Sequence, residues 1–217
     1  MDYEQTRHFM IEQQIRPWEV LDPVVLDLLS KVKREDFVPA IYRSLAFVDM
    51  AIPLGNGEFM WEPKLEARVL QDLTLKRSDR VLEVGTGSGY LTALLASLAM
   101  QVVSIEIDPA LKDEAEKKLK AHGLENVTLK VGDAARDWDA DGMFDAIVLT
   151  GSTPVLPEAY LSRLNPGGRL FALVGEGVMM KAILVTCVAA GACQRRTLFE
   201  TKVKALANAL EPERFEF

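Results

Sequence analysis

The sequence is poor in histidine and cysteine, the side chains that most often hold zinc and other transition metals. Its 217 residues include only two histidines, His8 and His122, and two cysteines, Cys187 and Cys193. Two thiolates alone make a poor metal site, and neither histidine stands in a metal or nucleophile pattern. We therefore expect no metal centre, and we predict surface or packing roles for both histidines.

Basic residues are outnumbered as well. The chain carries 25 Lys and Arg against 32 Asp and Glu, which gives a net charge of -7 and a pI near 5.0. General attraction to nucleic acid or anionic lipid is therefore unfavourable, and neither is an expected partner. The first residues, Met1–Gln5, are acidic and polar, whereas a secretory signal has a basic start followed by an apolar core. This start predicts a cytoplasmic protein.

The cysteines and the longest uncharged stretch have simple interpretations. Cys187 and Cys193 flank the small-residue turn of a predicted hairpin and could lie close together. Because a reducing cytoplasm disfavours disulfides, we expect free thiols. Residues 84–105 carry no charge but contain glycines and polar residues. They predict a turn, a helix and a strand rather than a membrane span.

A glycine-rich turn is the most informative feature of the chain. An apolar strand ends at Glu83, and Gly85, Gly87 and Gly89 follow at alternate positions. Glycine reaches positive φ without a Cβ clash, so such a turn can bring backbone N–H groups close to a ligand. The order is G-x-G-x-G rather than the G-x-G-x-x-G of dinucleotide enzymes, and the carboxylate of Glu83 would repel a pyrophosphate. The turn therefore favours S-adenosylmethionine over NAD.

A second acid supports a nucleoside site. Glu106 stands 23 residues after Glu83 and closes the strand Gln101–Ile105. In doubly wound folds, an acid that ends the second strand accepts hydrogen bonds from ribose hydroxyls. Asp133 follows the third strand at its carboxyl end, where open α/β sheets bind ligands, so it could accept from an adenine amine. An exposed strand end for Glu106 and a turn or helix cap for Asp133 are the structural alternatives.

Strand and helix signals alternate from about residue 80 to 174, which predicts parallel βαβ units in one α/β domain. The expected strands are 80–84, 101–106, 126–131, 144–150 and 168–174, with helices at 89–99, 109–122 and 156–164. Two apolar runs, 182–188 and 197–203, predict an antiparallel hairpin at the sheet edge.

The first 75 residues predict a helical cap over the core formed by residues 76–217. Helices are expected at Gln5–Ile15, Pro23–Lys31 and Glu66–Leu75. Val24, Val25, Leu28, Leu29 and Val32 are expected to form one buried stripe. Between the second and third helices, Ile52–Glu58 must bend because it contains two glycines and a proline.

Four segments together resemble the protein-L-isoaspartate O-methyltransferases. They are Arg34–Pro39, Leu54–Gly57, Val81–Tyr90 and Val131–Asp133, in that order. The resemblance implies a Rossmann-like class I methyltransferase fold, with a seven-stranded, mostly parallel sheet, an antiparallel C-terminal hairpin and an N-terminal helical extension. It also implies methyl transfer from S-adenosylmethionine to the side-branch carboxylate of isoaspartyl residues in damaged proteins, after which the ester collapses to a succinimide.

The resemblance assigns roles to individual residues. The methionine end of the cofactor would lie by the glycine turn, the ribose by Glu106, the adenine by Asp133, and the substrate mouth by Thr150. The full implied cofactor set is Glu83, Val84, Gly85, Thr86, Gly87, Ser88, Glu106, Ile107, Gly132, Asp133, Ala134, Thr150 and Gly151.

The acceptor half departs from the family pattern. The family carries a threonine, an apolar residue and a serine after the Gly-Asn-Gly bend, and those hydroxyls help to hold the acceptor carboxylate. Here the acceptor loop reads Phe59, Met60, Trp61 and Glu62, so both hydroxyls are missing. A Phe-Val-Pro-Leu-like segment that borders the family's peptide groove is matched at best by Val203–Leu206. The loop could be a lid over the cofactor or a rebuilt substrate pocket.

Three functions remain compatible with these residues. The first is an isoaspartyl-type carboxyl methyltransferase acting on proteins or peptides. The second is a methyltransferase for a small apolar or aromatic acceptor that stacks on Phe59 and Trp61. The third is a non-catalytic protein that binds S-adenosylmethionine. The resemblance favours the first function. Its carboxylate acceptor is already ionised at neutral pH, so no catalytic base is required.

Overall fold

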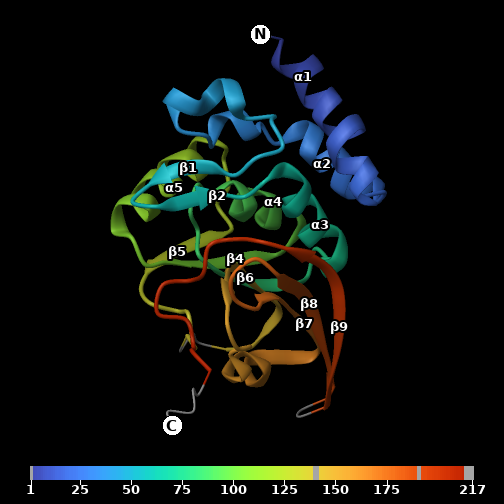
Figure 1. Cartoon of the computed structure of the whole chain (residues 1–217), viewed down its shortest axis with the longest axis vertical. Coiled ribbons are helices and arrows are strands. Elements are labelled where there is room, and N and C mark those ends of the chain that lie inside the picture. Colours follow the sequence, from blue (N-terminus) through green and yellow to red (C-terminus); the bar gives the residue numbers. More distant parts are fainter. Residues whose placement is uncertain (1, 139–141, 190–191, 213–217) are drawn as a thin grey trace.

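A seven-stranded sheet forms the centre of the molecule (Figure 1). The structure is a computed structural model that describes residues 2–138, 142–189 and 192–212. The strand order within these residues is β5-β4-β3-β6-β7-β8-β9; the first five strands are parallel, β8 is antiparallel to β7, and β9 is antiparallel to β8. The strands are β3 (Arg80–Val84), β4 (Gln101–Glu106), β5 (Val127–Val131), β6 (Phe144–Thr153), β7 (Leu164–Val174), β8 (Met180–Ala189) and β9 (Ala192–Thr201). The predicted fold class is confirmed.

Two of the predicted crossover helices form as expected. They are α4 (Tyr90–Leu98) and α5 (Pro109–Ala121). Asp108 caps α5 by accepting from the Ala110 N–H at 2.8 Å, and proline suits the first turn because its missing N–H needs no partner there. After the helix, the His122 ring packs 4.8 Å from the Phe37 ring, centroid to centroid, in agreement with its predicted packing role.

The predicted helix at 156–164 is wrong. The β6–β7 connection contains only the 3₁₀ helix Glu158–Arg163 (η5), and β7 already begins at Leu164. Pro154 and Pro157 precede it, and proline restricts the residue before it away from the α region. Too few residues then remain for a regular α-helix. Tyr160 anchors the short turn because its fully buried hydroxyl donates to the Ala134 carbonyl.

The N-terminal residues form helices and a small hairpin, shown in blue to cyan in Figure 1. The elements are α1 (Tyr3–Met10), the π-helical turn Ile11–Ile15 (η1), the 3₁₀ turn Arg16–Trp18 (η2), α2 (Pro23–Lys31), two further 3₁₀ turns, Arg34–Asp36 (η3) and Ala40–Leu45 (η4), then β1 (Ile52–Gly55), β2 (Glu58–Met60) and α3 (Pro63–Leu73). The predicted bend is an antiparallel hairpin in which Ile52 pairs with Met60. None of the described helices is both long and apolar enough to cross a membrane.

One position of the predicted stripe on α2 is wrong. Val25, Leu28 and Leu29 are buried, but Val24 is 57% exposed. Residues three and four apart share a helix face, whereas consecutive residues are about 100° apart. Val24 is four residues from Leu28 but about 100° from Val25, so it lies at the edge of the buried face, where its side chain reaches solvent.

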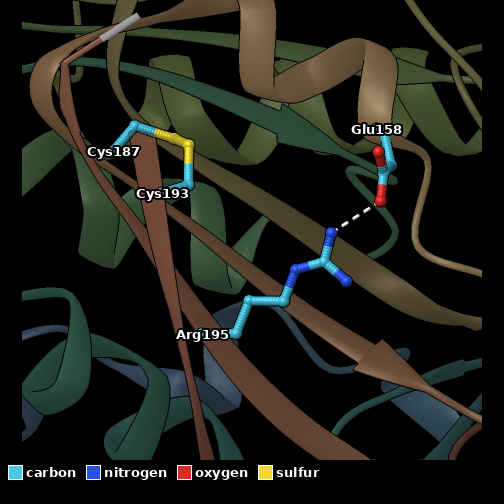
Figure 2. The surroundings of a disulfide bond; sticks show 4 residues. All are labelled: Glu158, Cys187, Cys193 and Arg195. Atoms are coloured by element: carbon cyan, nitrogen blue, oxygen red, sulfur yellow. Dashed lines mark hydrogen bonds and ion pairs between the residues drawn. A yellow bond between two sulfur atoms is a disulfide. The ribbon is translucent and has the colours of Figure 1, made fainter. Parts of the chain in front are cut away.

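The prediction of free thiols is also wrong. Cys187 and Cys193 form a disulfide across β8 and β9 (Figure 2), with their Cα atoms 4.0 Å apart. The two residues are direct partners in the antiparallel register, which brings their Cβ atoms together on one face of the sheet. The turn residues predicted the closeness of the two cysteines, but only the strand register makes them direct partners.

Candidate active site

The glycine turn joins β3 to α4 at the carboxyl edge of the sheet. Gly85 has a φ of 95°, and a Cβ there would lie 2.2 Å from the Thr150 hydroxyl oxygen. That hydroxyl donates to the carbonyls of Val84 and Gly85, at 2.7 Å each. Only glycine satisfies both the positive φ and the close approach of β6.

Glu106 supports the turn from the neighbouring strand. Its Oε2 accepts from the Gly87 N–H at 2.8 Å, and its Oε1 accepts from the Asp108 N–H at 3.1 Å. The side chain is 5% exposed and lines the central cavity. Each carboxylate oxygen has a second lone pair, so Glu106 can accept from a ligand hydroxyl while it holds the turn.

Glu83 lies behind the turn rather than on the wall of the cavity. It is fully buried, and its Oε2 accepts from the hydroxyls of Thr92 and Ser104 at 2.5 and 2.6 Å. Burial raises the pKa of Glu83 to about 8. The Ser104 hydroxyl is also 2.6 Å from the Thr86 hydroxyl, so Glu83 is connected to the turn through side chains. This position favours a supporting role over the direct cofactor contact that was expected.

A cavity of about 390 Å³ opens between the turn, the acceptor loop and the segment after β9. This volume lies in the usual range for small-molecule sites. Its wall contains every residue of the implied cofactor set except Glu83, together with the whole acceptor loop. These residues are Val84, Gly85, Thr86, Gly87, Ser88, Glu106, Ile107, Gly132, Asp133, Ala134, Thr150 and Gly151, and Phe59, Met60, Trp61 and Glu62.

The side of the cavity predicted to meet adenine is formed after β5. The Gly132 N–H donates to the Glu106 carbonyl at 2.9 Å, which brings the ends of β4 and β5 together. Asp133 Oδ1 accepts from the Ala135 N–H at 3.1 Å, and Oδ2 accepts from the Asn208 amide at 2.8 Å. Asp133 thus makes the turn contact considered as its alternative role, and it still lines the cavity.

The acceptor loop is fixed from behind by a buried arginine. Arg34 is fully buried; its guanidinium donates to the Trp61 carbonyl at 2.5 Å and to the Ala46 carbonyl at 2.8 Å, and it forms an ion pair with Glu66. The Trp61 side chain is only 8% exposed and belongs to the apolar core, whereas Phe59 is 48% exposed. The indole is therefore part of the protein interior as well as of the wall.

The segment after β9 is a part of the site that sequence reasoning largely missed. Residues 202–207 line the cavity, and Leu206 packs on Gly151, where a Cβ would lie 2.8 Å from Leu206 Cδ2. Ser152 fixes the segment by donating to the Lys204 carbonyl at 3.0 Å and accepting from the Leu206 N–H at 2.9 Å. The weak match of Val203–Leu206 to the family's groove segment was the only signal for it.

The comparison with protein families decides the assignment. The sequence matches the family described as protein-L-isoaspartate(D-aspartate) O-methyltransferase (PCMT) over residues 5–202. The chain belongs to this family. The predicted family, and with it the methyltransferase class of enzyme, is confirmed.

Relatives support this membership over most of their length. The chain is 36% identical to the protein-L-isoaspartate O-methyltransferase of Petrotoga mobilis over 86% of this chain and 88% of the relative. It is 40% identical to the protein-L-isoaspartate O-methyltransferase of Cronobacter sakazakii over 75% of this chain and 78% of that relative. Among solved structures, a Plasmodium falciparum protein-L-isoaspartate O-methyltransferase in complex with S-adenosyl-L-homocysteine has a TM-score of 0.80 at 20% identity, over 95% of this chain and 99% of that one. That likeness shows the shared fold.

Proposed function

We propose that this PCMT family protein transfers the methyl group of S-adenosylmethionine to the side-branch carboxylate of isoaspartyl residues in damaged proteins or peptides. The observation that carries the proposal is the family match over residues 5–202. The cavity wall supports it, because its glycine turn and carboxylates suit a nucleoside ligand. No specific observation favours a small apolar acceptor or a non-catalytic role.

The residues of the cavity fit the cofactor. A Cβ at Gly85 would collide with Thr150, so only glycine lets the backbone of the turn pack against β6 and form the cavity wall. We assign the methionine end to residues 84–88, the ribose to Glu106, the adenine to Ile107 and residues 132–134, and the transfer mouth to Thr150 and Gly151. Residues 76–217 would thus bind the cofactor, and residues 1–75 would cap it and supply the acceptor loop.

The chain's residues need not move a proton in this reaction. When bound, S-adenosylmethionine supplies an already activated methyl group. An isoaspartyl carboxylate is ionised at neutral pH, so it attacks without a general base. The wall would align the carboxylate oxygen with the methyl carbon and exclude water, and such alignment can lower the activation free energy by several kcal/mol.

The cytoplasmic location of the protein stays a prediction.

An assay with a radiolabelled methyl group tests the function. We expect the protein to label a peptide that contains one isoaspartyl residue and to release labelled methanol as the ester collapses. The matched control is the same peptide with an ordinary aspartyl residue, which should remain unlabelled. No label on either peptide, or equal label on both, would contradict the proposed function.

A Trp61→Ser variant tests whether the indole blocks the acceptor. Because the side chain is 8% exposed and packs in the core, we expect isoaspartyl turnover at or below that of the wild type. Initial rates on the same peptide measure this. Phe59→Ser, in the same loop but 48% exposed, is the control for adding a hydroxyl. A higher rate in Trp61→Ser than in the wild type would show instead that the indole occupies the acceptor's place.

A further inference from the structure

The cavity wall has an unusual balance of charge for an enzyme that receives a carboxylate. Among the described residues, its basic side chains are Lys202 and Lys204, both from the segment after β9. Its acidic side chains are Glu58, Glu62, Glu66, Glu106 and Asp133. Glu66 is paired with Arg34, but the other acids still outnumber the cations among the described wall residues, and both cations lie on that segment.

The backbone of Lys204 is held beside the expected transfer mouth. Ser152 bonds to the backbone on both sides of Ala205, through the Lys204 carbonyl and the Leu206 N–H. Leu206 points at Gly151 on the cavity wall. Lys204 and Leu206 both line the cavity. In Figure 1 this red segment leaves β9 and passes below β2.

Lys204 already holds a carboxylate in this position. Its ammonium forms an ion pair with Glu58 of β2, and its Nζ lies 3.7 Å from where a Cβ of Gly57 would be. The two side chains are 43% and 36% exposed, so the pair is open to solvent. An ion pair this exposed contributes little stability and can exchange its anion at low cost.

We propose that Lys204 binds the acceptor carboxylate and that Glu58 occupies its place when no acceptor is present. The inference rests on the proposed function and names the group that replaces the missing hydroxyls. The acceptor loop Phe59–Glu62 offers no side-chain hydroxyl to a carboxylate, and Lys204 lines the same cavity. An ammonium on one carboxylate oxygen leaves the other oxygen free to attack.

The chemistry predicts how Lys204 affects the kinetics. As the carboxylate oxygen bonds to the methyl carbon, the sulfur–carbon bond breaks, and the products are a neutral ester and a neutral thioether. The acceptor's negative charge is therefore smaller in the transition state than in the ground state. Lys204 binds the ground state more strongly, so it lowers KM without raising kcat. The product ester carries no charge and no longer pairs with the Lys204 ammonium, so Glu58 can pair with Lys204 again.

A Lys204→Met variant tests this inference. We expect the KM for the isoaspartyl peptide to rise about tenfold, in the range for loss of a bond to a charged group, with kcat unchanged or higher. Lys204→Arg should restore most of the affinity, and Glu58→Gln should lower KM. The matched control is Lys181→Met, since Lys181 is exposed on β8 and outside the cavity wall. It should leave KM unchanged.

Calorimetry separates failure of this inference from failure of the function. Titration with S-adenosylhomocysteine should give the same affinity in the wild type and Lys204→Met, and the peptide should bind the loaded wild type more tightly than the loaded variant. Wild-type turnover with an unchanged KM in Lys204→Met, or a loss confined to kcat, would overturn the role of Lys204 alone. If the wild type neither turns over nor binds the peptide, the proposed function and this inference both fail.

Discussion

Replacing Glu106 by glutamine is expected to weaken the binding of S-adenosylhomocysteine about 100-fold. The carboxylate accepts from the N–H groups of Gly87 and Asp108 and is proposed to accept from the ribose hydroxyls as well. Glutamine keeps the volume but loses the charge and offers one acceptor oxygen in place of two. A hydrogen bond to a charged group is worth about 1.5–3 kcal/mol, and a factor of about 100 corresponds to about 2.7 kcal/mol.

Isothermal titration calorimetry with the purified protein measures this change. Glu125→Gln makes the same acid-to-amide change on an exposed residue outside the cavity wall, so it should bind normally. A thermal melt of each variant shows whether the turn still folds. Equal affinity in Glu106→Gln and the wild type would remove Glu106 from the cofactor site.

Replacing Arg34 by methionine is expected to lower the free energy of unfolding by about 3–5 kcal/mol, the usual cost of leaving one member of a buried ion pair alone. Arg34 is fully buried, and the side chain of its partner Glu66 is 3% exposed. The carbonyls of Ala46 and Trp61 lose a donor too. The acceptor loop should loosen together with the core.

The loss of unfolding free energy in Arg34→Met should grow as the pH rises. Burial raises the pKa of Glu66, and Arg34 opposes the shift. Without Arg34 that pKa rises further, so the folded variant binds a proton that its unfolded chain releases at a lower pH. Stability of Arg34→Met is therefore retained at acidic pH and lost as the pH rises through the folded pKa.

Urea unfolding at pH 6 and pH 9 checks both statements. The double variant Arg34→Met/Glu66→Gln should recover part of the stability, because it buries no unpaired charge. Arg195→Met is the surface control, since Arg195 pairs with Glu158 at 2.6 Å in solvent (Figure 2) and should cost less than about 1 kcal/mol. An Arg34→Met variant as stable as this control would show that the buried pair is not needed.

The positions of most elements could be predicted from local patterns. The glycine turn, Glu106 and the alternating strands and helices from residue 80 follow from φ preference, apolar periodicity and capping, which are properties of neighbouring residues. The same local reasoning failed at 156–164, where two prolines shorten the helix to a 3₁₀ turn. The periodic pattern was also wrong at Val24, because this residue lies at the edge of the buried face of α2, where burial depends on the neighbouring elements.

The class of fold, the family and the strand ends at which a nucleoside should bind can be predicted from the amino-acid sequence, because each depends on short segments of neighbouring residues. The pairing of Cys187 with Cys193, the place of Glu83 behind the wall, and the contact of Lys204 with Glu58, 146 residues apart, follow from three-dimensional packing. Strand register and the packing of distant segments set these relations. No local pattern encodes which side chains will share a cavity once the chain has folded.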